Sequence, residues 1–145
     1  MLFTSCSSDD NNTDAVVEVQ LEEAMVQNSP WTFDHYELIN IVNTGTSTMT
    51  AAQIQSDMNL ELNGFTLVFN EDGTGVTVIE GEESENWTWV IENENDLRIQ
   101  FTGENVDLYS NLSFVNSQLK MESESVTFDS TANFEVLHYG SLVFE

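Results

Sequence analysis

The fold is decided by the stretch GFTLVFNEDGTGVTV, residues 64–78. Alternate residues from Phe65 to Phe69 are large and apolar, which is the period of a strand with one buried face. The Asp72-Gly73 pair that follows predicts a tight hairpin, because glycine readily adopts the positive φ angles that such turns need. The apolar alternation resumes after the turn, so we expect two antiparallel strands here.

The same period of two continues to the end of the chain. Turns are expected at 80–85 and 93–96, and further strands at 87–91, 97–101, 106–115, 118–122, 125–129 and 133–144. Short strands at regular spacing are typical of an antiparallel sandwich or barrel. Sequential hairpins favour an all-β, up-and-down antiparallel barrel of about eight strands, since closure removes exposed sheet edges. At that size the interior is either filled by side chains or holds one small ligand.

The residues before Gly64 predict one long strand and two short helices. A helical period begins at Val17 and places Leu21, Ala24 and Met25 on one face, and Pro30 ends it. Residues 31–42 predict a strand, with Trp31, Phe33, His35, Glu37 and Ile39 on one face and Tyr36 and Leu38 on the other. The second helix is expected near residues 50–62. Its start carries the capping-box pattern Thr50-Ala-Ala-Gln53, and Asn63-Gly64 supplies its stop.

The composition favours one acidic domain. The 145 residues include 40% apolar residues, enough for one core, and a single cysteine excludes an internal disulfide. The net charge is −24, from 26 acidic and only two basic residues. Nucleic acid is therefore excluded as a partner, because phosphate binding needs clustered Lys and Arg. We expect a soluble monomer with a solvated acidic surface rather than a cation site, since the acids are scattered along the chain.

The first twelve residues, MLFTSCSSDDNN, resemble a bacterial lipobox followed by an acidic tether. Cys6 would be the lipidated residue, which makes the protein anchored rather than free. We therefore expect a residual signal or lipobox over 1–6, a flexible acidic tether over 7–16 and the barrel domain over 17–145. The full signal is expected upstream of this stretch. The alternative is an ordinary buried or free cysteine near a frayed terminus.

Four segments resemble, in this order, the lipocalin-like domain of Bacteroidota lipoproteins: WTFDHYE (31–37), LNGFTLVF (62–69), DGTG (72–75) and NWTW (86–89). The resemblance covers residues 31–144. It implies a small eight-stranded barrel with no defined ligand. The acidic run after Cys6 is similar to the tether that sends such lipoproteins to the outer face of the outer membrane, which is where we expect this protein.

A ligand inside the barrel would meet the inward apolar residues, namely Trp31, Phe33, Phe65, Leu67, Phe69, Trp87, Trp89, Ile99 and Phe101. Aromatic faces can line an apolar pocket, but large aromatics also commonly fill a core. His35 and His138 could meet if the first and last strands pair, and with Glu37 they would suggest a metal site. Two histidines give an incomplete ligand set, so we expect no metal, no cofactor and no catalytic residues.

Two functions follow from these patterns. The first is a lipid-anchored, non-enzymatic lipocalin-like barrel that binds a small apolar or amphipathic ligand in its interior. The second is a surface interaction or structural module with a filled barrel and an unknown protein partner. A closed interior filled by side chains would favour the second.

Overall fold

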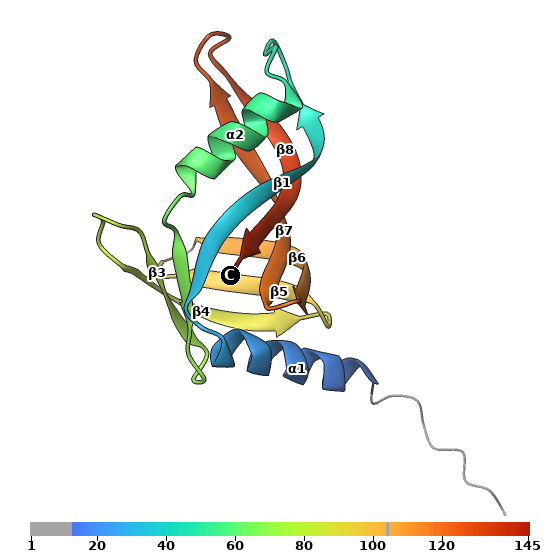
Figure 1. Ribbon diagram of the computed structural model, residues 1–145, viewed down its shortest axis with the longest axis vertical. Coiled ribbons are helices and arrows are strands. Elements are labelled where there is room, and N and C mark those ends of the chain that lie inside the picture. The colour runs from blue at the N-terminus through green and yellow to red at the C-terminus, as the bar shows by residue number, and fades with distance from the viewer. Residues whose placement is uncertain (1–12, 104) are drawn as a thin grey trace, which may run out of the picture.

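The chain folds as a closed barrel of eight antiparallel strands with two short helices (Figure 1). The computed structural model describes residues 13–103 and 105–145. Each strand pairs with the next along the chain, and β8 pairs back on β1 to close the barrel. The all-β, up-and-down architecture expected from the sequence is confirmed.

The elements follow one another in the order expected. They are α1 (Thr13–Gln27), β1 (Trp31–Asn43), α2 (Ala51–Glu61), β2 (Thr66–Phe69), β3 (Thr74–Val78), β4 (Glu85–Glu92), β5 (Asp96–Phe101), β6 (Val106–Val115), β7 (Gln118–Asp129) and β8 (Phe134–Phe144).

Two of the expected boundaries were wrong. Helix α1 begins at Thr13, four residues before the helical period expected from Val17. The spacing of apolar residues did not predict this start, because the helix begins with the polar residues Thr13 and Asp14. The strands expected at 118–122 and 125–129 form one continuous strand, β7, because the polar residues between them pair with β8. Residues 1–12, which include Cys6, lie outside the described part of the chain.

The prediction that alternate residues from Trp31 to Ile39 share one face of β1 was also wrong. Trp31 and Phe33 are buried, but the next buried residue is Tyr36 rather than His35, and Ile39 is 52% exposed. The pairing of β1 with β8 shifts register between 33 and 35, between 38 and 40, and between 41 and 43. Each such irregularity displaces the alternation by one residue and bends the strand.

Helix α2 is fastened to this irregular strand. Its capping box is formed as expected, because Thr50 Oγ1 accepts from the Gln53 amide at 3.3 Å and Gln53 Oε1 accepts from the Thr50 amide at 2.9 Å. The side chain of Asn59 accepts a hydrogen bond from the Tyr36 backbone amide at 2.7 Å, and Gln55 accepts one from Leu38 at 3.1 Å. The helix therefore satisfies polar backbone groups of β1 while it covers the strand.

Helix α1 packs against the barrel at the opposite end of β1 from α2 (Figure 1). Its buried residues Leu21 and Met25 belong to the main core, which agrees with the apolar face expected for this helix. The Trp31 indole donates a hydrogen bond of 2.8 Å to the Met25 carbonyl in the last turn. Because the last carbonyls of a helix lack partners within it, this bond also ties the helix end to β1.

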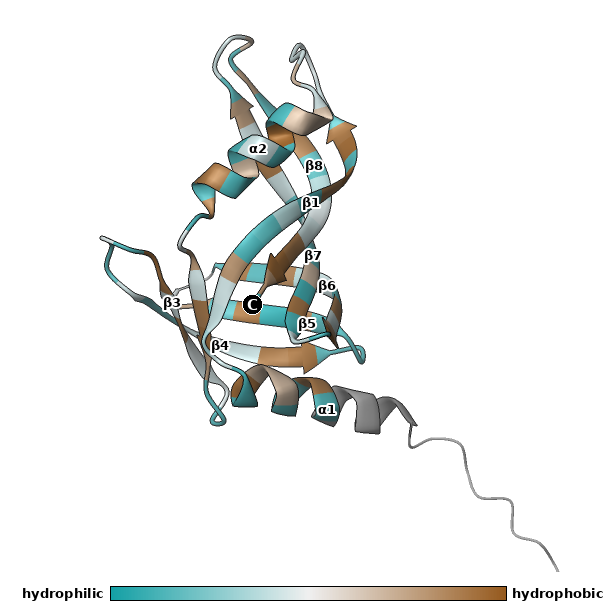
Figure 2. Cartoon of the chain, in the orientation of Figure 1, coloured by the Kyte–Doolittle hydropathy of each residue, from teal (hydrophilic) through white to brown (hydrophobic). Residues whose placement is uncertain are grey.

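The strands divide the molecule into two parts (Figures 1 and 2). One part is the barrel proper, where the first residues of β1 pair with β2. In the other, the far ends of β1, β7 and β8 extend together and α2 crosses one face of them. Strand β6 pairs with β5 over 106–109 but with β7 only over 110–115. Within the described chain, β6 and β7 therefore diverge toward α2.

Candidate binding site

The residues expected to line a ligand cavity belong to the hydrophobic core or pack against it. Six of the nine are buried and three lie partly buried at the margin of the core; the buried six are Trp31, Phe33, Leu67, Phe69, Trp87 and Ile99. Phe69 lies edge-to-face with Trp87 at 5.1 Å and with Trp89 at 5.2 Å between ring centroids. Such pairs stabilise a core beyond their buried area. This packing indicates that side chains fill the barrel interior in the region where these residues lie.

Trp87 shows how closely this part is filled. Its indole nitrogen donates to the Thr77 hydroxyl at 2.8 Å, and Thr77 is itself buried. A Cβ atom added at Gly75, opposite Trp87 in the β3–β4 ladder, would lie 1.9 Å from the indole ring. Glycine at this position is therefore what makes room for the ring.

The two histidines do not meet, although the strands that carry them do pair. His35 lies across the ladder from Val143, whereas His138 lies across from Ile41, six residues further along β1. Strand residues advance about 3.3 Å each, so this offset is on the order of 20 Å. The metal site considered for His35, His138 and Glu37 is therefore not assembled. Among the described residues, no group of three or more candidate ligands could hold a metal ion.

His138 instead belongs to a buried polar network. Its Nδ1 lies 2.8 Å from the Tyr36 hydroxyl and its Nε2 lies 2.9 Å from the Thr127 hydroxyl. Burial lowers the pKa of His138 and raises the pKa of Tyr36 to about 12. Both groups are therefore neutral near pH 7, and both ring nitrogens of His138 are occupied by hydroxyl partners.

His35 has a different environment on the outer face. Its ring nitrogens lie 2.6 Å from Asp34 and 3.2 Å from Glu37, and Glu37 also pairs with Lys120. The hydrogen bond to Asp34 raises the pKa of His35, and the bond from Lys120 lowers the pKa of Glu37. These half-exposed groups form a surface ion-pair chain.

The site with the character of a ligand pocket lies where β6 and β7 diverge. It measures about 410 Å³ and is lined by Met58, Leu62, Val106, Asp107, Leu108, Tyr109, Ser123, Glu124, Ser125 and Leu142. Met58 and Leu142 are buried core residues, so the pocket reaches from the surface to the core. Ligand pockets typically combine such apolar walls with a few polar groups that orient the ligand.

The polar groups of this pocket come from Asp107 and Tyr109 of β6 and from 123–125 of β7. Asp107 is itself exposed, and Tyr109 is half-buried. Asp107 pairs with Ile99 and Tyr109 pairs with Leu97 across the ladder, and both partners are buried. The Tyr109 hydroxyl donates to an Asp107 oxygen at 3.4 Å. Burial raises the pKa of the Asp107 carboxyl and the pKa of Tyr109. A carboxylate in this position can accept a hydrogen bond from a ligand hydroxyl or amine.

None of the nine predicted residues lines this pocket. Trp89 lines a second pocket beside α1, while Trp87 and Phe101 line a third along β3–β5. The alternation of 106–115 could have suggested that Asp107 and Tyr109 share a face. The contribution of Met58 on α2 and of Leu62 at its C-cap to the pocket had no local sequence signal, because it depends on where the helix packs.

The fold and the site define a class, a small closed antiparallel barrel with a side pocket. Comparison of the chain with family models, curated proteins and solved structures found no match. Neither helix in the described part of the chain could span a bilayer.

Proposed function

We propose that the chain is a lipid-anchored lipoprotein of the cell envelope whose lipocalin-like barrel binds a small amphipathic ligand and catalyses no reaction. The observation that supports it best is the pocket between β6 and β7, where core residues and the Asp107 carboxylate meet beside the unpaired part of β6. The site thus differs from the aromatic interior expected from the sequence.

The pocket walls suggest the chemical class of the ligand. Its apolar part would pack on Met58, Leu62 and Leu142, and a hydroxyl or amine would donate to Asp107. A neutral or cationic polar group is favoured over an anionic one, because Glu124 also lines the pocket and the net charge is −24.

A calorimetric titration with 1-decanol tests the ligand-binding proposal. Decanol should bind saturably, and Ser125→Leu should abolish binding by filling the pocket. Asp107→Ala should weaken binding by about 1–3 kcal/mol, the range for a lost hydrogen bond to such a group. Thr32→Leu, an exposed change on β1 outside this pocket, is the matched control. Equal binding by Ser125→Leu and the control would contradict the proposed location.

The anchor is tested separately at Cys6. Expressed behind a complete lipoprotein signal, the protein should fractionate with membranes, because several acyl chains anchor stably where one is marginal. Cys6→Ala should move it to the soluble fraction, and Cys6→Ser serves as a second variant. A Cys6→Ala protein that still pellets with membranes would show that the anchor lies elsewhere.

A second function, an interaction module, is favoured by exposed apolar residues on the outer face of β7. Val126 is 50% and Phe128 58% exposed, and Val126 pairs with Leu137 of β8. Exposed apolar patches mark contact sites when they are contiguous. If decanol fails to bind, a photo-crosslinker at Phe128 should capture one defined envelope neighbour. Equal capture of that neighbour by a photo-crosslinker placed at the exposed residue Thr32 would contradict the interaction-module function.

A further inference from the structure

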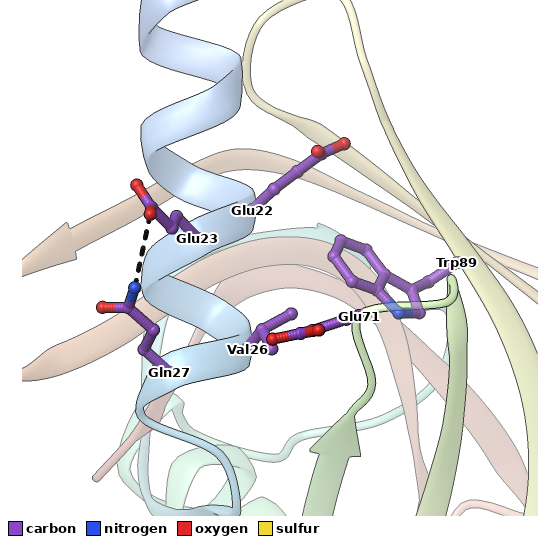
Figure 3. Close-up of a pocket in the computed structure, with 6 residues that line it drawn as sticks. All are labelled: Glu22, Glu23, Val26, Gln27, Glu71 and Trp89. Atoms are coloured by element: carbon purple, nitrogen blue, oxygen red, sulfur yellow. Dashed lines mark hydrogen bonds between the residues drawn. The ribbon is translucent and has the colours of Figure 1, made fainter.

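A second pocket lies between α1, the turn after β2 and the face of β4 (Figure 3). It measures about 340 Å³ and is lined by Glu22, Glu23, Val26, Gln27, Glu71 and Trp89. The lining comes from three elements that are far apart in the sequence. In Figure 3 the Trp89 ring lies across from α1, the Glu71 side chain lies between the ring and Val26, and the Glu22 side chain extends from α1 above the ring. This pocket is separate from the pocket at β6 and β7, with which it shares no residue.

The aromatic wall of this pocket is held rigidly. The Trp89 indole nitrogen donates to the Thr74 carbonyl at 3.0 Å, and the ring meets Phe69 edge-to-face at an interplanar angle of 87°. Trp89 is nonetheless only partly buried, unlike Trp31 and Trp87. The core thus fixes the ring in place while part of it remains available to a ligand.

Every charged residue that lines the pocket is acidic. Three of its six residues are glutamates, and none is basic. Both basic residues of the chain have partners elsewhere, Lys120 with Glu37 and Arg98 with Gln100. Carboxylates around a concave apolar surface focus a negative potential and raise the local concentration of cations.

We propose that this pocket binds an organic ammonium ion, a quaternary or substituted amine with an apolar surface. The positive group would lie over the Trp89 ring, the best aromatic partner for a cation, with Glu22 and Glu71 beside it. Val26 supplies apolar contact for the substituents. A bare metal ion fits less well, because Val26 and Trp89 give the wall an aliphatic and an aromatic part. The proposal depends neither on the anchor nor on the decanol site.

Choline and its neutral isostere 3,3-dimethylbutan-1-ol are the probes, titrated calorimetrically into the full chain. Choline should bind saturably and the isostere should not. Trp89→Leu should weaken choline binding roughly 3- to 30-fold, the range for an exposed to a desolvated cation–π contact. Glu71→Gln and Glu22→Gln should also weaken binding. Glu82→Gln, the same charge change at an exposed residue outside the pocket, should not.

Several results would overturn the proposal. Equal affinity for choline and the isostere would rule out recognition of the charge. Equal losses from Glu71→Gln and Glu82→Gln would mean that a diffuse field, and not this pocket, attracts the cation. Circular dichroism shows whether Trp89→Leu remains folded. If Trp89→Leu does not fold, the comparison of Glu71→Gln with Glu82→Gln decides the outcome. If the native chain does not bind choline, the proposed site is rejected.

Discussion

His138 and His35 lie on paired strands, but their pKa values are shifted in opposite directions. His138 is fully buried between the hydroxyls of Tyr36 and Thr127, and burial lowers its pKa below 6.5. His35 is half-exposed beside Asp34 and Glu37, and its pKa is raised. One histidine thus resists protonation in the folded state, whereas the other favours it.

The stability of the fold should therefore depend on both residues between about pH 5 and 7.5. Because the unfolded chain protonates His138 more readily, its contribution to stability is present above pH 6.5 and is lost as the pH falls below it. His35 stabilises below pH 6.5 and loses that effect as the pH rises through its folded pKa.

The His35→Asn variant isolates the His138 effect. Its free energy of unfolding should fall more than that of the native chain between pH 7.5 and 5.5, because the stabilising effect of His35 at low pH is gone. NMR titration of the His138 ring should give a pKa below 6.5. A His138 ring that titrates at or above 6.5 would contradict its placement.

At the scale of elements, α2 depends on its cap. Thr50→Ala removes the hydroxyl that accepts from the Gln53 amide. Loss of such an N-cap costs about 1 kcal/mol. Since Asn59 and Gln55 fasten α2 to β1, the loss should appear in the global unfolding free energy from urea titration. Thr48→Ala, also exposed but outside the capping box, is the control. Equal effects of the two variants would mean that the cap does not stabilise α2.

The elements also show what could be predicted from the sequence. Period-two alternation, the Asp72-Gly73 hairpin and the Thr50–Gln53 box are local signals, and all three formed the expected structures. The irregularities of β1 were missed because register depends on the partner strand. The pocket at Asp107 and Tyr109 was missed for the same reason, since it exists only where β6 leaves β7. Composition identified the large apolar residues but could not distinguish a packed ring from a pocket wall.

The molecule as a whole has 26 acidic residues against two basic ones, which gives a net charge of −24. Repulsion between exposed like charges destabilises the compact state, and salt screens it beyond about 10 Å at 0.1 M ionic strength. The melting temperature should therefore rise between low salt and several hundred millimolar sodium chloride. Potassium chloride at the same ionic strength serves as a control for specific binding of sodium. A melting temperature that stays constant or falls would mean that the acidic residues are already compensated.

The location of the ligand pocket is tested most directly by methionine-methyl NMR during a titration with 1-decanol. Met58 lines the pocket between β6 and β7, whereas Met25, on α1, is buried in the core. Met58→Leu and Met25→Leu assign the two signals. We predict a saturable shift of the Met58 methyl signal while the Met25 signal stays in place. A shift of Met25 together with the Trp87 indole signal would place the ligand in the aromatic interior, and no shift at either methionine would contradict ligand binding at this barrel.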